Sequence, residues 1–200
     1  MKAALAFAST ALLLVGESSA TAGVLITVTQ SGSDVVASGV GTLDTTSLTL
    51  PSTSDGFGVL SPFGAGIRLG PSSPTSFTQY SVISGPETIG PGGTTPASSG
   101  SGGLFGVFGL FHSLSVPSGY TSGSSLSGSA TWDGTTISAL GLTPGTYTWT
   151  WGRGPDADSL TVNIGTVPEP TTLTLLGIGI AGVAGGTWLR RKRVASKVPA

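Results

Sequence analysis

The residues best suited to a chemical role form an aromatic row in segment 146–151. This segment alternates threonines with Tyr147, Trp149 and Trp151. Because side chains alternate across a strand, the three rings share one face and the threonines share the other. Such a row can stack on sugar rings as a carbohydrate-binding platform, or it can fill the core of a sheet, where aromatic strand residues are more often found. We interpret the row as core and keep the carbohydrate contact as the alternative.

Other residues that could catalyse a reaction or hold a metal are few and scattered. The chain has no Cys and one His, His112, which excludes thiolate metal sites, Cys nucleophiles, disulfides and sites that need two imidazoles. Asp156 and Asp158 suit a hard cation, but a calcium site needs six to eight oxygens. The nucleophile-elbow pattern G-x-S-x-G is absent. We therefore predict that the protein is not an enzyme and has no metal or cofactor, with His112 packed or on the surface.

The composition is unlike that of a cytosolic enzyme. Charged residues make up 8% of the 200 residues, against about 25% in an ordinary globular protein. The chain contains 33 Gly, 13 Pro and 57 Ser or Thr. Between residues 23 and 170 there are two basic and eight acidic residues, a balance that would repel nucleic acid. The length fits one domain.

The N-terminal segment 1–22 has the layout of a secretory signal peptide. Lys2 is followed by the apolar run 3–15 and then by small residues that end at Ala20 and Ala22. A short cationic start, an apolar stretch and an A-x-A-like site are typical of a cleaved export signal. We expect cleavage after Ala20 or Ala22, and export of the rest of the chain.

The C-terminal segment 171–189 is predicted to be a transmembrane helix. It contains 19 residues without a charge, and a helix of that length reaches about 28 Å, close to the thickness of the hydrocarbon core. A basic cluster follows at once, formed by Arg190, Arg191, Lys192 and Arg193. Such clusters stay on the cytoplasmic side. We therefore expect a periplasmic body and a cytoplasmic tail at 194–200.

The junction between body and helix carries the most specific motif, formed by Val167, Pro168, Glu169 and Pro170. The two prolines keep this segment out of helices and sheets, so it stays extended at the membrane face. Motif, apolar helix and basic cluster in this order, over residues 167–193, resemble the PEP-CTERM sorting signal of Gram-negative bacteria. The resemblance implies processing by an exosortase, a membrane protease. It also implies that the protein is first an inner-membrane precursor and then reaches the cell surface or extracellular matrix. The resemblance further implies an association with exopolysaccharide and biofilm.

The body, residues 23–166, is predicted to be an all-β ectodomain, either a β-sandwich or a jelly roll. Many short β-rich runs are separated by Gly, Pro and Ser, and no amphipathic helix stands out. The expected strands are 24–30, 34–43, 45–50, 56–60, 67–69, 76–83, 104–110, 127–132, 135–140, 146–151 and 159–164. Asp133-Gly134 predicts a tight turn. Segment 85–103 has too little apolar surface to order itself and is expected to be a flexible loop.

Two functions are compatible with these features. The first is a non-catalytic surface or matrix protein whose uncharged Ser/Thr-rich face contacts exopolysaccharide or is glycosylated. The second is a dedicated carbohydrate-binding or adhesive module that uses Tyr147, Trp149 and Trp151. Burial of this aromatic row favours the first function, and exposure favours the second.

Overall fold

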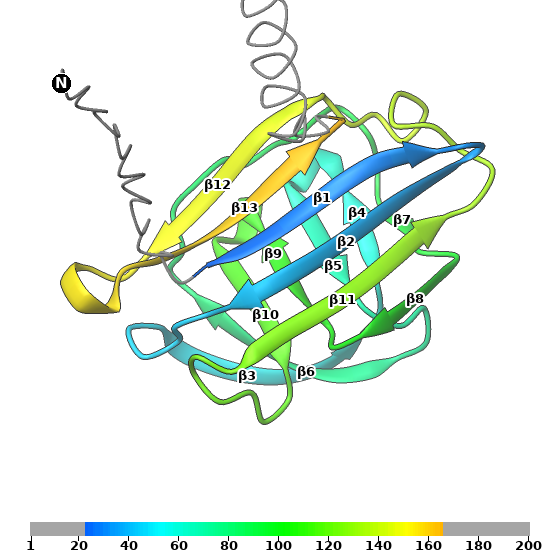
Figure 1. Ribbon diagram of the computed structural model, residues 1–200. Coiled ribbons are helices and arrows are strands. Elements are labelled where there is room, and N and C mark those ends of the chain that lie inside the picture. The colour runs from blue at the N-terminus through cyan, green and yellow to red at the C-terminus, as the bar shows by residue number, and fades with distance from the viewer. Residues whose placement is uncertain (1–22, 166–200) are drawn as a thin grey trace, which may run out of the picture.

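The computed structural model describes residues 23–165, which form two β-sheets packed face to face (Figure 1). The strands are β1 (Val24–Ser31), β2 (Asp34–Thr42), β3 (Thr49–Gly56), β4 (Val59–Ser61), β5 (Gly66–Leu69), β6 (Thr75–Ser81), β7 (Thr95–Pro96), β8 (Ser99–Gly102), β9 (Phe105–Phe108), β10 (Ser113–Pro117), β11 (Ser125–Trp132), β12 (Gly145–Trp151) and β13 (Asp158–Ile164). Three short 3-10 helices interrupt them, η1 (Pro62–Gly64), η2 (Gly109–Phe111) and η3 (Gly154–Asp156). The predicted all-β sandwich is confirmed for the described residues.

The first sheet has six strands in the order β12-β13-β1-β2-β11-β8. Its centre is the β1–β2 hairpin, in which Ser31 pairs with Asp34 and leaves a two-residue turn. Gly32 in that turn has φ +61°, a conformation that favours glycine and matches the twist of a hairpin. Strands β1 and β13 run parallel, and their neighbours are antiparallel.

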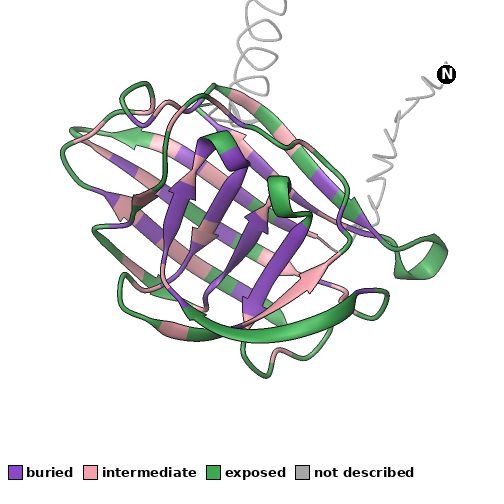
Figure 2. Cartoon of the chain, turned by 180° about the vertical axis from the view of Figure 1, so that it is seen from behind, coloured by how far each residue is buried: buried purple, intermediate pink, exposed green. Residues whose placement is uncertain are grey.

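The second sheet has seven strands in the order β3-β6-β10-β9-β5-β4-β7, all antiparallel. Its middle strands β4, β5, β9 and β10 are buried at most positions, as the purple strands of Figure 2 show. The edge strand β3 is exposed at seven of its eight positions and appears almost entirely green.

Alternating residues of both sheets meet in one hydrophobic core. The six-stranded sheet contributes a buried side chain at every second position of β13 and of β1 as far as Val28, as expected for strands with a single core-facing side. The core side chains of the two sheets include Ile26, Val28, Trp149, Leu160, Val162, Ile67, Leu69, Phe105, Val107 and Leu114.

Two of the predicted segments fold differently in the structure. Segment 135–140 is a turn and not a strand, because Gln30 bonds the Thr135 carbonyl and the Ile137 N–H, and Leu140 N–H bonds the Thr136 carbonyl. Segment 85–103, expected to be a loop, contains β7 and β8, which pair with β4 and β11. Ile89 within it is buried in the core.

Strand β10 and the later half of β3 were not predicted from the sequence. The expected strand 45–50 overlaps β3 at its beginning only.

The structure does not describe either end of the chain. The described residues exclude the predicted signal peptide at 1–22, residue 166 and the C-terminal segments. Within 23–165, no helix has the length and apolar character needed to cross a membrane.

Candidate functional site

The aromatic row of β12 faces the interior of the sandwich. Trp149 is 0% exposed and Trp151 5% exposed, while Tyr147 is partly buried against the core. Each indole also donates a hydrogen bond inward: Trp149 Nε1 to the Pro86 carbonyl at 2.9 Å, and Trp151 Nε1 to the Asp44 carbonyl at 2.7 Å. The interpretation as core is confirmed. The alternative, in which this aromatic row stacks on sugar rings, is wrong for Trp149 and Trp151, because both indoles are buried.

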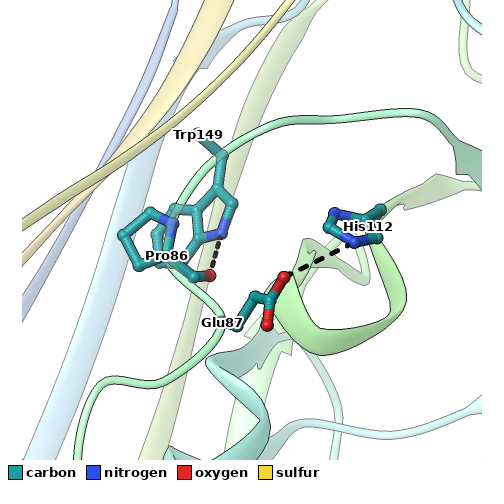
Figure 3. A network of polar contacts seen from close by, with 4 residues as sticks. All are labelled: Pro86, Glu87, His112 and Trp149. Carbon is teal, nitrogen blue, oxygen red and sulfur yellow. Dashed lines mark hydrogen bonds and ion pairs between the residues drawn. The ribbon is translucent and has the colours of Figure 1, made fainter.

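His112 lies on the surface close to the buried Trp149. Its Nε2 is 3.7 Å from Glu87 Oε1, and both side chains are more than half exposed. Figure 3 shows this pair next to the hydrogen bond between Trp149 and Pro86. His112 follows η2 with φ +48°. Segment 86–87 therefore contacts β12 through Trp149, and it contacts His112, the residue between η2 and β10.

Asp156 and Asp158 do not form a pair in the structure. Asp156 is exposed in η3, whereas Asp158 is buried at the start of β13. Asp158 accepts the backbone N–H of Asp44 through Oδ2 and that of Ser159 through Oδ1, the latter at 2.7 Å. Both oxygens therefore bind backbone donors. Among residues 23–165, no group of three or more His, Cys, Asp or Glu side chains could hold a metal ion.

We expect Asp158 to make the stability of the protein depend on pH. Burial raises the pKa of its carboxyl, and the hydrogen bonds from Asp44 and Ser159 oppose this shift only in part. A raised folded-state pKa means that the stabilisation is complete below the ordinary carboxyl pKa of about 3.9 and is lost as the pH rises through the folded-state value. We expect Asp158→Asn to remove this decline. Urea unfolding of both proteins between pH 3 and 7 measures it, and an unchanged slope would contradict the assignment.

The outer face of the six-stranded sheet carries side chains of a different kind. The register aligns one polar side chain from each strand in a row: Thr146, Asn163, Thr27, Ser38, Ser129 and Ser101. A second row holds Thr148, Thr161, Leu25, Val40 and Ser127. We call these two rows the hydroxyl face. None of its side chains is charged.

Neighbouring side chains of the hydroxyl face bond to one another across the strands. Thr146 Oγ1 donates to Asn163 Oδ1 at 2.9 Å, and the hydroxyls of Ser101 and Ser129 are 3.0 Å apart. Leu25 and Val40 lie directly opposite each other at the centre and are 42% and 62% exposed. The strand spacing of about 4.8 Å sets the interval between the polar groups. The result is a regular polar array around a small apolar centre.

Such an array offers a sugar polymer two kinds of contact. Each hydroxyl can donate one hydrogen bond and accept two, which suits the hydroxyl groups at the edges of sugar rings. The apolar pair of Leu25 and Val40 suits the C–H face of a ring. The alternating threonines of segment 146–151 indicated the polar side of β12, but the rows across six strands depend on pairings that one sequence does not reveal.

The residues of the predicted sorting signal lie outside the described residues. These are Val167, Pro168, Glu169 and Pro170 of the motif, together with the basic cluster Arg190, Arg191, Lys192 and Arg193. A family model of the PEP-CTERM protein-sorting motif matches residues 166–193, a range that contains both groups and confirms the resemblance. No curated protein and no solved structure matches the chain. The motif implies export, and sorting by an exosortase through a membrane-anchored signal.

Proposed function

We propose that this chain, a protein with a PEP-CTERM sorting signal, is a non-catalytic component of the cell surface that associates with exopolysaccharide matrix. The observation that carries the proposal is the match of the sorting motif to residues 166–193. In this proposal the exosortase cuts at or near Val167–Pro170, and the sandwich is delivered as the mature protein. The segment 171–189, predicted to be a helix, then serves as a transient anchor in the inner membrane, with the body in the periplasm.

The chemistry of the described residues supports a role without catalysis. His112, the one histidine, is exposed and faces Glu87. Asp158, the buried acid, is occupied by backbone N–H groups. A general base must reach a proton within a plausible substrate pose, and neither His112 nor Asp158 lines the two cavities formed by residues 102–127 and by Arg68 with its neighbours.

The hydroxyl face supports the association with polysaccharide. It is uncharged and rich in donors and acceptors, so it can contact a polymer of hydroxylated rings through many weak interactions. Rigid strands hold its side chains in register, which lowers the entropic cost of ordering them on binding. An extended face of this kind suits contact with a polymer, as in a matrix protein, whereas a single small molecule is usually bound in a pocket.

Val40→Glu tests this use of the hydroxyl face. A carboxylate at the apolar centre must be desolvated on contact with a sugar ring, so we expect the affinity for exopolysaccharide to fall roughly tenfold or more. The side chain is 62% exposed, so folding stability should stay within about 0.5 kcal/mol. Co-sedimentation of the purified protein with exopolysaccharide isolated from the producing cells measures the effect.

Ser72→Glu is the matched control. Ser72 lies in the exposed turn between β5 and β6, away from the hydroxyl face, and it receives the same charge. Its variant should sediment with the polysaccharide as the wild type does. Equal binding by Val40→Glu and wild type would show that the hydroxyl face is not the contact surface.

A further inference from the structure

The outer face of the seven-stranded sheet is covered by three large side chains. The guanidinium carbon of Arg68, on β5, is 4.7 Å from the ring centroid of Phe77 and 5.0 Å from that of Phe108. Small residues beneath make room for these groups. A Cβ on Gly66 would lie 2.4 Å from Cε1 of Phe108, so the ring rests directly on the backbone. Arg68 is therefore held between two aromatic rings in a fixed position.

Arg68 has no acidic partner. No carboxylate oxygen of the described residues lies within salt-bridge distance of its guanidinium, although acids outnumber bases there. Its Nε is buried and makes no hydrogen bond within residues 23–165. Burial also lowers the pKa of the side chain. A half-buried cation normally acquires a partner, and a buried donor without one calls for an explanation.

A small cavity adjoins this cation. It has a volume of about 180 Å³ and is lined by Arg68, Gln79, Phe108, Phe111 and Ser113. Phe111 projects from η2 and is 66% exposed, with its ring centroid 6.4 Å from that of Phe108. The cavity is smaller than the roughly 300–1,000 Å³ of most small-molecule sites. It is therefore suited to one unit of a larger polymer.

We propose that this cavity binds one carboxylated sugar unit of an acidic polysaccharide. The planar guanidinium of Arg68 matches a carboxylate, which it can bind through two parallel hydrogen bonds. Phe111 offers an exposed ring face to the apolar side of the sugar, and Gln79 and Ser113 offer polar groups to its hydroxyls. This inference rests on the proposed role in the matrix, but it uses the opposite sheet from the hydroxyl face.

Binding of defined oligosaccharides to the full chain in detergent tests the proposal by calorimetry. The probes are trigalacturonate, its carboxyl-reduced neutral form and the peptide triglutamate. We expect trigalacturonate to bind, and the other two to bind at least tenfold more weakly. Arg68→Gln should weaken trigalacturonate binding roughly tenfold to a hundredfold. Arg68→Lys should weaken binding less, because lysine keeps the positive charge and loses only the planar pair of donors.

Two further variants keep the test independent of folding. Phe111→Ala removes an exposed side chain, so the sheet should fold normally while trigalacturonate binding falls roughly tenfold. Arg153→Gln removes the other cation of the described residues and should leave binding within about twofold if the effect is local. Urea unfolding of each variant identifies any that fail to fold.

The outcomes separate this proposal from that of the hydroxyl face. Val40→Glu should bind trigalacturonate as the wild type does, whatever its effect on the native exopolysaccharide. Equal binding of triglutamate would show a general anion site and overturn the assignment to a sugar. Equal effects of Arg68→Gln and Arg153→Gln would show that only the net charge of the protein matters, and would overturn the site. Absence of any trigalacturonate binding by the wild type would also reject the proposal.

Discussion

Replacing Pro168, Glu169 and Pro170 together with alanine is expected to leave the entire precursor in the inner membrane. We expect the prolines to keep the segment out of a helix and available to a protease, whereas three alanines would favour continuation of the predicted apolar helix. Glu169 is also the one charge between the sandwich and the basic cluster. Cell fractionation with antibody against the body should find wild type at the surface or in the medium, and the variant with the inner membrane.

The matched control changes three residues of the tail beyond the basic cluster. Val194→Ala, Ser196→Ala and Val198→Ala leave the sorting motif, the apolar segment and the charges intact. This control should be sorted like the wild type. If the triple alanine variant at 168–170 also reached the surface at wild-type levels, the motif would not be the processing determinant.

Trp149→Ala is expected to cause the largest loss of folding stability of any single substitution considered. The side chain is 0% exposed in the core and donates to the Pro86 carbonyl. Truncating a buried Trp costs about 3–5 kcal/mol, and the unpaired carbonyl adds to the cost. That sum is a large part of the roughly 5–15 kcal/mol that stabilises an ordinary domain.

Thr150→Ala is the control for this prediction, because the next residue of the same strand points outward and is exposed. It should change the unfolding free energy by about 0.5 kcal/mol or less. Urea unfolding, followed by the fluorescence of the remaining tryptophans, measures both variants. A loss below about 1 kcal/mol for Trp149→Ala would show that the row does not hold the sandwich together.

The features that could be predicted from the sequence depend on local patterns. The β1–β2 hairpin follows from two alternating runs around Gly32, and both runs are strands in the structure. The spacing of two residues in a strand places Trp149 and Trp151 on one face, and their aromatic character favoured the core, where the structure buries both. In each case neighbouring residues decide the structure, so one sequence is sufficient.

The features that could not be predicted depend on contacts between distant residues. Segment 135–140 has the composition of a strand, but the side chain of Gln30 binds its backbone groups and holds a turn. Segment 85–103 has few apolar residues, yet its backbone pairs with β4 and β11, and Trp132 Nε1 donates to the Thr95 carbonyl at 3.1 Å. Pairing of its backbone orders this segment, although its low apolar content predicted a flexible loop.

The site around Arg68 shows the same limit. Arg68, Phe77 and Phe108 come from β5, β6 and β9, and no periodic spacing in the sequence connects them. The cavity beside them also needs Phe111 of η2. Only the register of the seven-stranded sheet brings these side chains to one face.

The most direct test of exosortase-dependent sorting is the intact mass of the mature protein from cells with and without the exosortase. If the sorting signal is cut at or near Val167–Pro170, protein from cells with the enzyme lacks residues 171–200, and protein from cells without it retains them. Both forms should lack the signal peptide. Mature protein that carries residues 171–200 in cells that possess the exosortase would contradict sorting, and would make the chain a simple one-span membrane protein.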